Sequence, residues 1–164
     1  PGPCAAITAL SISGLPTGRF TFEGFLSTAK KSRAAHLASL ENETRTMIFY
    51  EAPHKLCTTL NDLAAAFGAE RRISLCRELT KLHEEVLRMT LGEAVGYYAE
   101  NAPRGEYVLI VEGAKPVVKT LSLDDAVGQV QALLEQGFSK KDAVKQVSAE
   151  SGFPKNALYE AVVK

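Results

Sequence analysis

The spacing of hydrophobic and polar positions changes several times along the first two thirds of the chain. Residues 19–25 alternate polar and aromatic side chains, which is typical of a strand with one buried face. Residues 46–50 are a nearly continuous apolar run, which is typical of a strand buried on both faces. Apolar side chains then recur at helical spacing between residues 56 and 67. The pattern predicts strands and helices that follow one another.

The same reasoning predicts the other elements before residue 113. Strands are expected at residues 72–77, 86–90 and 107–111, and helices at 4–13, 53–67 and 92–101. A basic loop that contains Lys30, Lys31 and Arg33 is expected to precede a further helix that ends near Glu41. This alternation indicates an α/β layer structure.

The last part of the chain has a different pattern, with no strand signal. Three helices are expected there, because Ser122 and Ser139 each precede an aspartate by three residues and so resemble capping boxes. Gly152 is expected to end the second helix and Pro154 to begin the third. Two short helices joined by a glycine-containing turn resemble a helix-turn-helix, although a plain three-helix packing unit explains the pattern equally well.

Composition narrows the function classes. The 164 residues suit one domain, or one domain with a small appendage, and 46% of them are hydrophobic. The 19 Lys and Arg residues balance the 19 Asp and Glu residues, so any nucleic-acid binding must use a local patch. No apolar run approaches the roughly 18 residues that a membrane span requires. The chain begins Pro1-Gly2-Pro3-Cys4 with no signal-peptide pattern, so we expect a piece of a longer polypeptide.

The sequence lacks the motifs that are typical of several kinds of site. Phosphate-binding glycine loops and the nucleophile-elbow motif are absent. The three histidines are scattered and the three cysteines are widely spaced, so neither a metal site nor a disulfide framework is expected. Reduced thiols in a cytosolic protein are the simplest interpretation.

Four segments could carry a ligand site. Cys4, Ala5 and Ala6 follow a turn and begin a helix of small residues, where free backbone N–H groups and short side chains let a ligand approach. The other segments lie next to predicted strands, where ligand groups gather in α/β sheets; they are residues 48–54, 77–81 and 105–106. A simple turn, a salt bridge or a helix cap would give the same patterns.

Residues 19–36 carry four Lys or Arg residues against one acid. Contacts with phosphate groups of a nucleic acid would explain this local charge and would make binding depend on salt. A solvated loop is the alternative.

Short segments in a fixed order resemble one family along nearly the whole chain. Residues 1–6, 14–16, 22–26, 48–54, 77–81 and 105–113 resemble the ribosomal RNA small subunit methyltransferase I family. Residues 155–159 are similar to the C-terminal helical extension of that family.

The resemblance implies a tetrapyrrole-methylase-type (class III) fold, in which two α/β domains hold S-adenosylmethionine between them. Residues 1–114 would be the C-terminal α/β domain, a mixed sheet flanked by helices. Residues 115–120 would be a linker, and 121–164 a three-helix, helix-turn-helix-like extension. The N-terminal domain, with its glycine-rich loop, would be missing, so we expect the chain alone to be inactive.

The resemblance also implies an activity, 2′-O-methylation of a cytidine ribose in 16S rRNA of the small ribosomal subunit, by a cytoplasmic homodimer. Carried over by position, the expected cofactor contacts are Cys4, Ala5, Ala6, Tyr50, Glu51, Leu79, Thr80, Gly105 and Glu106. The expected rRNA contacts are Lys30, Lys31, Arg33 and Arg77, and no catalytic base is assigned.

Two other functions remain open at this point. A methyltransferase acting on a tetrapyrrole precursor would share the fold. A non-enzymatic nucleic-acid-binding module built on the helix-turn-helix would not use S-adenosylmethionine.

Overall fold

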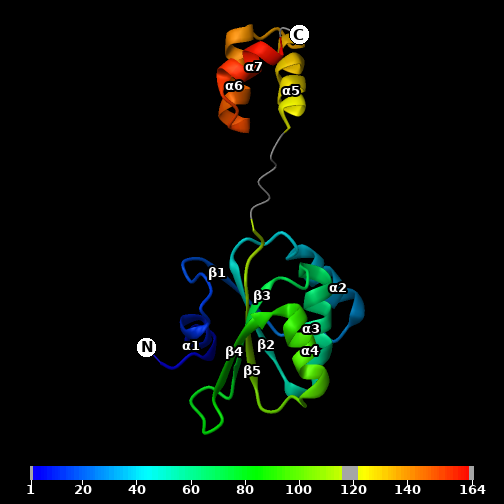
Figure 1. The fold of residues 1–164 in the computed structure, drawn as a ribbon. Helices are drawn as coiled ribbons and strands as arrows, with labels where there is room; N and C mark the ends of the chain where they lie inside the picture. Colours follow the sequence, from blue (N-terminus) through cyan, green and yellow to red (C-terminus); the bar gives the residue numbers. More distant parts are fainter. Residues whose placement is uncertain (1, 116–121, 163–164) are drawn as a thin grey trace. The chain divides into compact units, whose positions relative to one another are not determined.

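The computed structural model describes residues 2–115 and 122–162 (Figure 1). The chain divides into two compact units, Pro1–Pro116 and Val117–Lys164. Apart from Lys115, the linker expected at 115–120 lies outside the described residues. The two units are therefore treated separately.

The first unit is built on a five-stranded mixed sheet. Its strands are β1 (Phe20–Gly24), β2 (Thr46–Glu51), β3 (Arg72–Arg77), β4 (Glu85–Thr90) and β5 (Tyr107–Val111). Their spatial order is β1-β2-β5-β3-β4. The β1–β2 pair is parallel and the other pairs are antiparallel. The α/β fold with a mixed sheet is thus confirmed.

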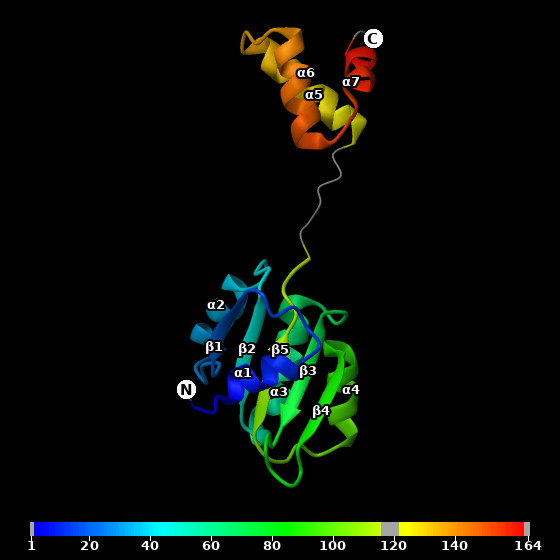
Figure 2. The same cartoon turned by 90° about the vertical axis from the view of Figure 1, so that its left-hand side faces the viewer.

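Helices cover both faces of the sheet, which explains why residues 47–50 of β2 and all residues of β5 are apolar or aromatic. Helices α2 (Lys30–Ser39), α3 (Pro53–Phe67) and α4 (Leu91–Glu100) lie on one face, and α1 (Ala5–Ile12) lies on the other (Figures 1 and 2). Met47 and Phe49 of β2 enter the core beneath the three helices, whereas Ile48 between them enters the core beneath α1. Alternate side chains of a strand point to opposite faces, so both sets must be apolar.

One predicted boundary is wrong. The expected basic loop at Lys30, Lys31 and Arg33 is the first turn of α2. Ala29 is the extended residue before the helix, and Ser27 Oγ accepts a hydrogen bond from its N–H at 3.1 Å. Lysine, alanine and leucine are good helix formers, so the loop ends at Ala29.

The second unit consists of α5 (Leu123–Glu135), α6 (Lys140–Ser151) and α7 (Lys155–Ala161). The capping box predicted at Ser122 is present, with Asp125 as its partner. At Ser139 the side chain accepts from Asp142 N–H, but no reciprocal bond returns to the Ser139 backbone. These helices share a core of small and branched side chains: Ala126, Val130, Ala143, Val144, Val147 and Leu158. Within the described ranges of both units, none of the helices has the length and apolarity to cross a membrane.

The backbone at Gly113 passes so close to the backbone of Thr44 and Arg45 that a larger residue does not fit there. A Cβ atom built on Gly113 would lie 2.1 Å from the carbonyl oxygen of Thr44 and 2.7 Å from that of Arg45. We expect Gly113→Ala to lower the free energy of unfolding by about 1 to 3 kcal/mol, because backbone must move to admit the methyl group.

Gly96 is the matched control. It lies in the interior of α4 with no atom within 4 Å of its built Cβ. Gly96→Ala should raise the free energy of unfolding by about 0.5 to 1 kcal/mol, since alanine loses less backbone entropy in a helix. Urea unfolding of both variants measures the difference, and equal effects would contradict the close crossing at Gly113.

Candidate functional site

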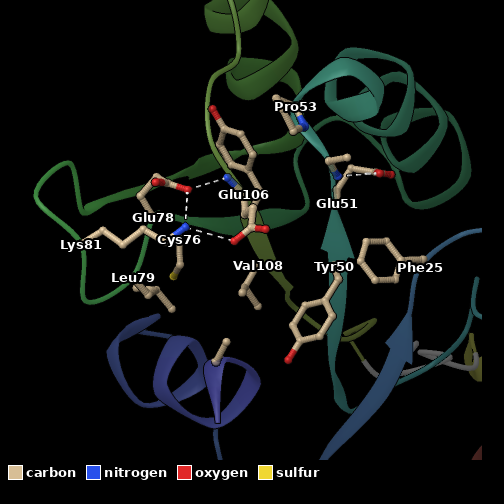
Figure 3. A pocket seen from close by; sticks show the side chains of 13 residues that line it. Phe25, Tyr50, Glu51, Pro53, Cys76, Glu78, Leu79, Lys81, Glu106 and Val108 are labelled. Atoms are coloured by element: carbon tan, nitrogen blue, oxygen red, sulfur yellow. Dashed lines mark hydrogen bonds and ion pairs between the residues drawn. The ribbon is translucent and has the colours of Figure 1, made fainter. Parts of the chain in front are cut away.

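A cavity of about 570 Å³ lies where the carboxyl ends of β2 and β3 meet the start of β5 (Figure 3). Its floor is one row of residues across three strands. Tyr50 of β2 is paired with Val108 of β5, which is paired in turn with Cys76 of β3. The pairing places these three side chains on the face that α1 covers, where Ala5 completes the wall.

Aromatic rings form one side of the cavity. The rings of Phe25 and Tyr50 meet edge to face, with centroids 5.6 Å apart, and Phe22 meets the same tyrosine at 5.2 Å. Phe25 is 65% exposed, which is high for a phenylalanine. A planar apolar surface is therefore available to a ligand that enters the cavity.

Charged side chains form the opposite rim. Lys81 Nζ lies 3.0 Å from Glu78 Oε1 and 3.1 Å from Glu106 Oε2. Glu78 Oε1 also accepts a hydrogen bond from the Glu106 N–H at 2.9 Å. These bonds join the loop after β3 to the residue before β5, so the rim is fixed by contacts from both sides.

The rim depends on an unusual backbone. Glu78 and Thr80 have φ angles of 49° and 63°, in the left-handed region that non-glycine residues seldom adopt. Gly105 has a φ of 75°, and a Cβ there would lie 2.5 Å from Glu78 Cγ. Only glycine lets the two loops approach closely enough for the Glu78 bond to Glu106.

Hydrogen bonding favours the charged forms of two rim residues, Glu78 and Lys81. The Glu106 N–H, and then Lys81, lower the pKa of Glu78 below its usual value. Glu78, and then Glu106, raise the pKa of Lys81. At the floor, burial raises the pKa of the Cys76 thiol, so that side chain stays neutral.

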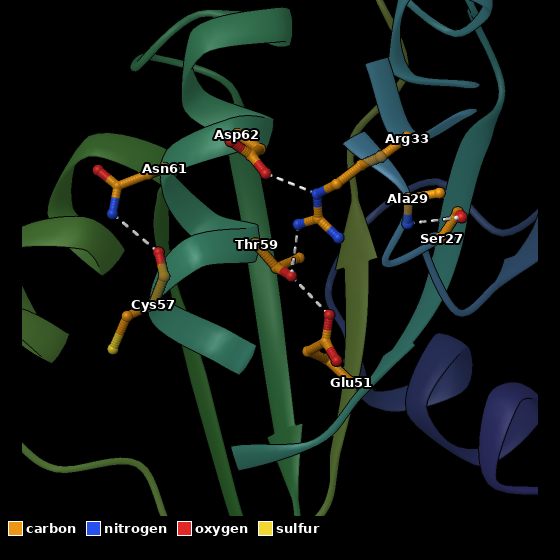
Figure 4. A network of polar contacts seen from close by, with 8 residues as sticks. All are labelled: Ser27, Ala29, Arg33, Glu51, Cys57, Thr59, Asn61 and Asp62. Atoms are coloured by element: carbon orange, nitrogen blue, oxygen red, sulfur yellow. Dashed lines mark hydrogen bonds and ion pairs between the residues drawn. The ribbon is translucent and has the colours of Figure 1, made fainter. Parts of the chain in front are cut away.

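The Glu51 carboxylate turns away from the cavity into a polar network (Figure 4). Thr59 Oγ1 donates to Glu51 Oε2 at 2.5 Å, and the Ala52 N–H donates to Glu51 Oε1 at 2.9 Å. Arg33 Nη2 donates to Thr59 Oγ1 at 2.8 Å, and Arg33 Nε lies 2.6 Å from Asp62 Oδ2. The network links α2, α3 and the end of β2, and so fixes the backbone that borders the cavity.

The cavity gathers some of the residues expected to contact a cofactor. Five of them line it: Ala5, Tyr50, Glu51, Leu79 and Glu106. Cys4, Ala6, Thr80 and Gly105 are their sequence neighbours and do not line it. Sequence reasoning missed the other eight lining residues, which are Phe25, Ala52, Pro53, Cys76, Glu78, Lys81, Tyr107 and Val108. Seven of them lie in segments that carry the family resemblance, whereas Cys76 gave no signal beyond a strand pattern.

The four residues expected to contact rRNA lie in different settings. Lys30 and Lys31 are exposed on α2. The Arg33 side chain is only 13% exposed and belongs to the polar network. Arg77 Nε lies 3.3 Å from Glu85 Oε2 on the neighbouring strand, an ion pair without hydrogen-bond geometry. Among residues 2–115 and 122–162, no group of three or more His, Cys, Asp or Glu side chains could hold a metal ion.

Replacing Thr59 tests the polar network. Thr59→Val keeps the shape of the buried side chain but leaves Glu51 Oε2 and Arg33 Nη2 without this partner, so we expect a loss of about 1 to 3 kcal/mol in the free energy of unfolding. Thr58 is the exposed neighbour, and Thr58→Val should change it by less than about 0.5 kcal/mol. Urea unfolding of the two variants checks this, and similar losses would argue against the network.

Comparison with known proteins shows the family of this chain. Residues 1–95 match the family model of Tetrapyrrole (Corrin/Porphyrin) Methylases. Proteins named ribosomal RNA small subunit methyltransferase I from Synechocystis sp. and Escherichia coli O157:H7 are each 44% identical over 98% of this chain. The resemblance found in the sequence is thereby confirmed.

The alignments cover 58% of the Synechocystis relative and 56% of the E. coli relative, so the chain spans a little over half their length. The crystal structure of the methyltransferase CobJ is similar in fold, with a TM-score of 0.54 at 21% identity; the match covers 70% of this chain and 49% of that one. The chain belongs to the tetrapyrrole (corrin/porphyrin) methylase family.

Proposed function

We propose that this chain provides part of the S-adenosylmethionine site of an RNA methyltransferase that methylates the 2′-oxygen of a cytidine ribose in 16S rRNA. The observation that carries the proposal is the cavity at the end of β2, with an aromatic wall on one side and a charged rim on the other. The names of the relatives at 44% identity support rRNA of the small subunit as the substrate.

The cavity suits this cofactor in size and chemistry. Its volume of about 570 Å³ lies within the range of about 300 to 1,000 Å³ typical of ligand pockets. Phe25, Tyr50 and Val108 offer apolar surface for an adenine ring. Glu78 and Glu106 offer carboxylates to ribose hydroxyls and to a positively charged ligand, and the Glu106 side chain is 84% exposed and open to a further donor.

When bound, S-adenosylmethionine supplies an electrophilic methyl group on a sulfonium centre. The residues of this chain would hold the cofactor by its adenosine end, so that the methyl group meets the ribose oxygen in a fixed geometry. Such positioning contributes several kcal/mol to a transfer reaction. Lys81 stays protonated between two carboxylates, so we assign it to holding the rim and not to accepting the hydroxyl proton.

The partners follow from the same proposal. The substrate would be 16S rRNA within the small ribosomal subunit, met in the cytoplasm by a homodimer. Lys30 and Lys31 are exposed and free to approach phosphate groups, and Arg33 and Arg77 would do so from within their ion pairs.

Binding of S-adenosylmethionine to the chain tests the cavity directly. We expect isothermal titration calorimetry to detect it, and Gly105→Ala to weaken it about tenfold or more, because the added methyl group displaces Glu78 from the rim. Gly128→Ala in α5 is the control, since no atom lies within 4 Å of its built Cβ. Equal affinity of the Gly105 and Gly128 variants would place the cofactor elsewhere.

The reaction itself requires a longer protein. We would join the chain to the part of the E. coli relative that it does not span and follow labelled methyl groups into small ribosomal subunits. A 2′-O-methyl group blocks alkaline cleavage of the adjoining phosphodiester, so the label should remain in an alkali-resistant dinucleotide. Label in an alkali-sensitive nucleotide, or only in a tetrapyrrole acceptor, would overturn the proposed ribose reaction.

A further inference from the structure

A second cleft, of about 210 Å³, lies beside the first turn of α3 and shares no lining residue with the cavity. The same turn separates the two sites. Ala52 and Pro53 border the cavity, and the next two residues, His54 and Lys55, border the cleft. A ligand longer than one nucleotide unit could therefore reach both sites around the start of one helix.

Every side chain that lines the cleft can donate a hydrogen bond. Arg33, His54 and Lys55 supply nitrogen donors, and four hydroxyl side chains join them: Ser27, Thr28, Thr58 and Thr59. No carboxylate lines the cleft. A phosphate group offers only acceptor oxygens and carries negative charge, so it complements this lining.

The two carboxylates that bond to side chains of the cleft already have partners. Asp62 is bound by Arg33 Nε, and Glu51 by Thr59 and the Ala52 N–H. Arg33 therefore keeps Nη1 without a hydrogen-bond partner among the described residues, on a side chain that lines the cleft (Figure 4). Within the same part of the chain, no carboxylate oxygen lies within 4 Å of Lys55 Nζ or of the His54 ring.

The helix that borders the cleft begins in an electrostatically unfavourable way. The first turn of α3 carries His54 and Lys55, has no acidic residue and has no side-chain cap. The first turn of α2 carries Lys30 and Lys31 and likewise has no acid. The lysine charges in these two first turns lie at the positive end of a helix dipole and are repelled by it, and a bound anion would relieve both repulsions.

We propose that this cleft binds a backbone phosphate of the substrate RNA, next to the nucleotide whose ribose enters the cavity. The inference rests on the proposed function and adds the place where the RNA strand is held. An RNA strand fits better than a free phosphate ion, because Lys30 and Lys31 extend the positive charge beyond the cleft along α2. Lys55 is the side chain that we expect to contribute most, since it is cationic and free of the polar network.

Binding of a fluorescent single-stranded RNA oligonucleotide to the full chain tests the proposal. Anisotropy titrations at several salt concentrations should show Lys55→Gln binding about tenfold more weakly than the native chain. The slope of log affinity against log salt should become shallower by about 0.7, the value for one phosphate contact on single-stranded nucleic acid. Lys55→Arg should restore both the affinity and the slope.

Two controls separate this inference from other effects. Lys115→Gln removes the same charge from an exposed residue beyond the end of β5, which pairs with the start of β2 at the other end of the sheet from the cleft, and should leave the slope unchanged. Lys55→Gln should bind S-adenosylmethionine as the native chain does, because Lys55 does not line the cavity. Equal slopes for the Lys55 and Lys115 variants would overturn the phosphate contact and leave the proposed function standing.

Inorganic phosphate distinguishes the two sources of the anion. In a nuclear magnetic resonance titration, RNA should shift the backbone amide resonances of His54 and Lys55. If inorganic phosphate shifts them and RNA does not, the cleft binds a free anion and the inference of an RNA contact is wrong. If the chain binds neither RNA nor S-adenosylmethionine, the proposed function fails together with the inference.

Discussion

The antiparallel pairing of β2 with β5 is the constraint on which the rest of the structure depends. Both strands are buried on both faces, so every side chain from Met47 to Phe49 must fit a core on one side or the other. The register of this pairing then determines which side chains face the cavity. Because Tyr50 is opposite Val108 and Glu51 opposite Tyr107, the cavity side chain and the network side chain alternate on the two faces of the sheet. A shift of one residue would exchange them.

Glu51 connects the cavity to the second cleft, because it lines the cavity and bonds to Thr59, which lines the cleft. Its carboxylate is held on the α3 side by Thr59, which is held by Arg33 of α2, while its neighbour Tyr50 stands in the cavity on the other side of the sheet. The polar network thus couples the position of α2 to the backbone at the end of β2. In the proposed function, an RNA strand that contacts the start of α3 would act on the same backbone that borders the cofactor.

Much of the fold follows from the sequence because burial leaves a direct pattern in it. The uninterrupted apolar residues of β2 and β5, and the helical spacing of leucines in α3, are local signals of a local structure. The insertion of β5 between β2 and β3 is different, since strand order depends on pairings between distant segments. The start of α2 does not follow from charge, because its lysines are compatible both with a solvated loop and with a helix.

The candidate site was predicted less completely, for a physical reason. The segment around Glu78 was recognised, but Leu79 and Thr80 were favoured over the two charged residues that form the rim. Which of these side chains faces the cavity depends on the left-handed backbone at Glu78 and Thr80 and on the close approach of Gly105. Those conformations arise from tertiary contact and leave no periodicity to detect.

The neutral state of Cys76 has a consequence in the proposed function, in which the cavity would hold a methyl donor. A thiolate is a much stronger nucleophile than a ribose hydroxyl, and this sulfur stands in the floor of the very cavity proposed for the cofactor. Burial against α1 and the raised pKa keep the proton on the sulfur. The neutral thiol is a much weaker nucleophile than a thiolate, so a methyl donor bound in the same cavity would methylate this sulfur only slowly.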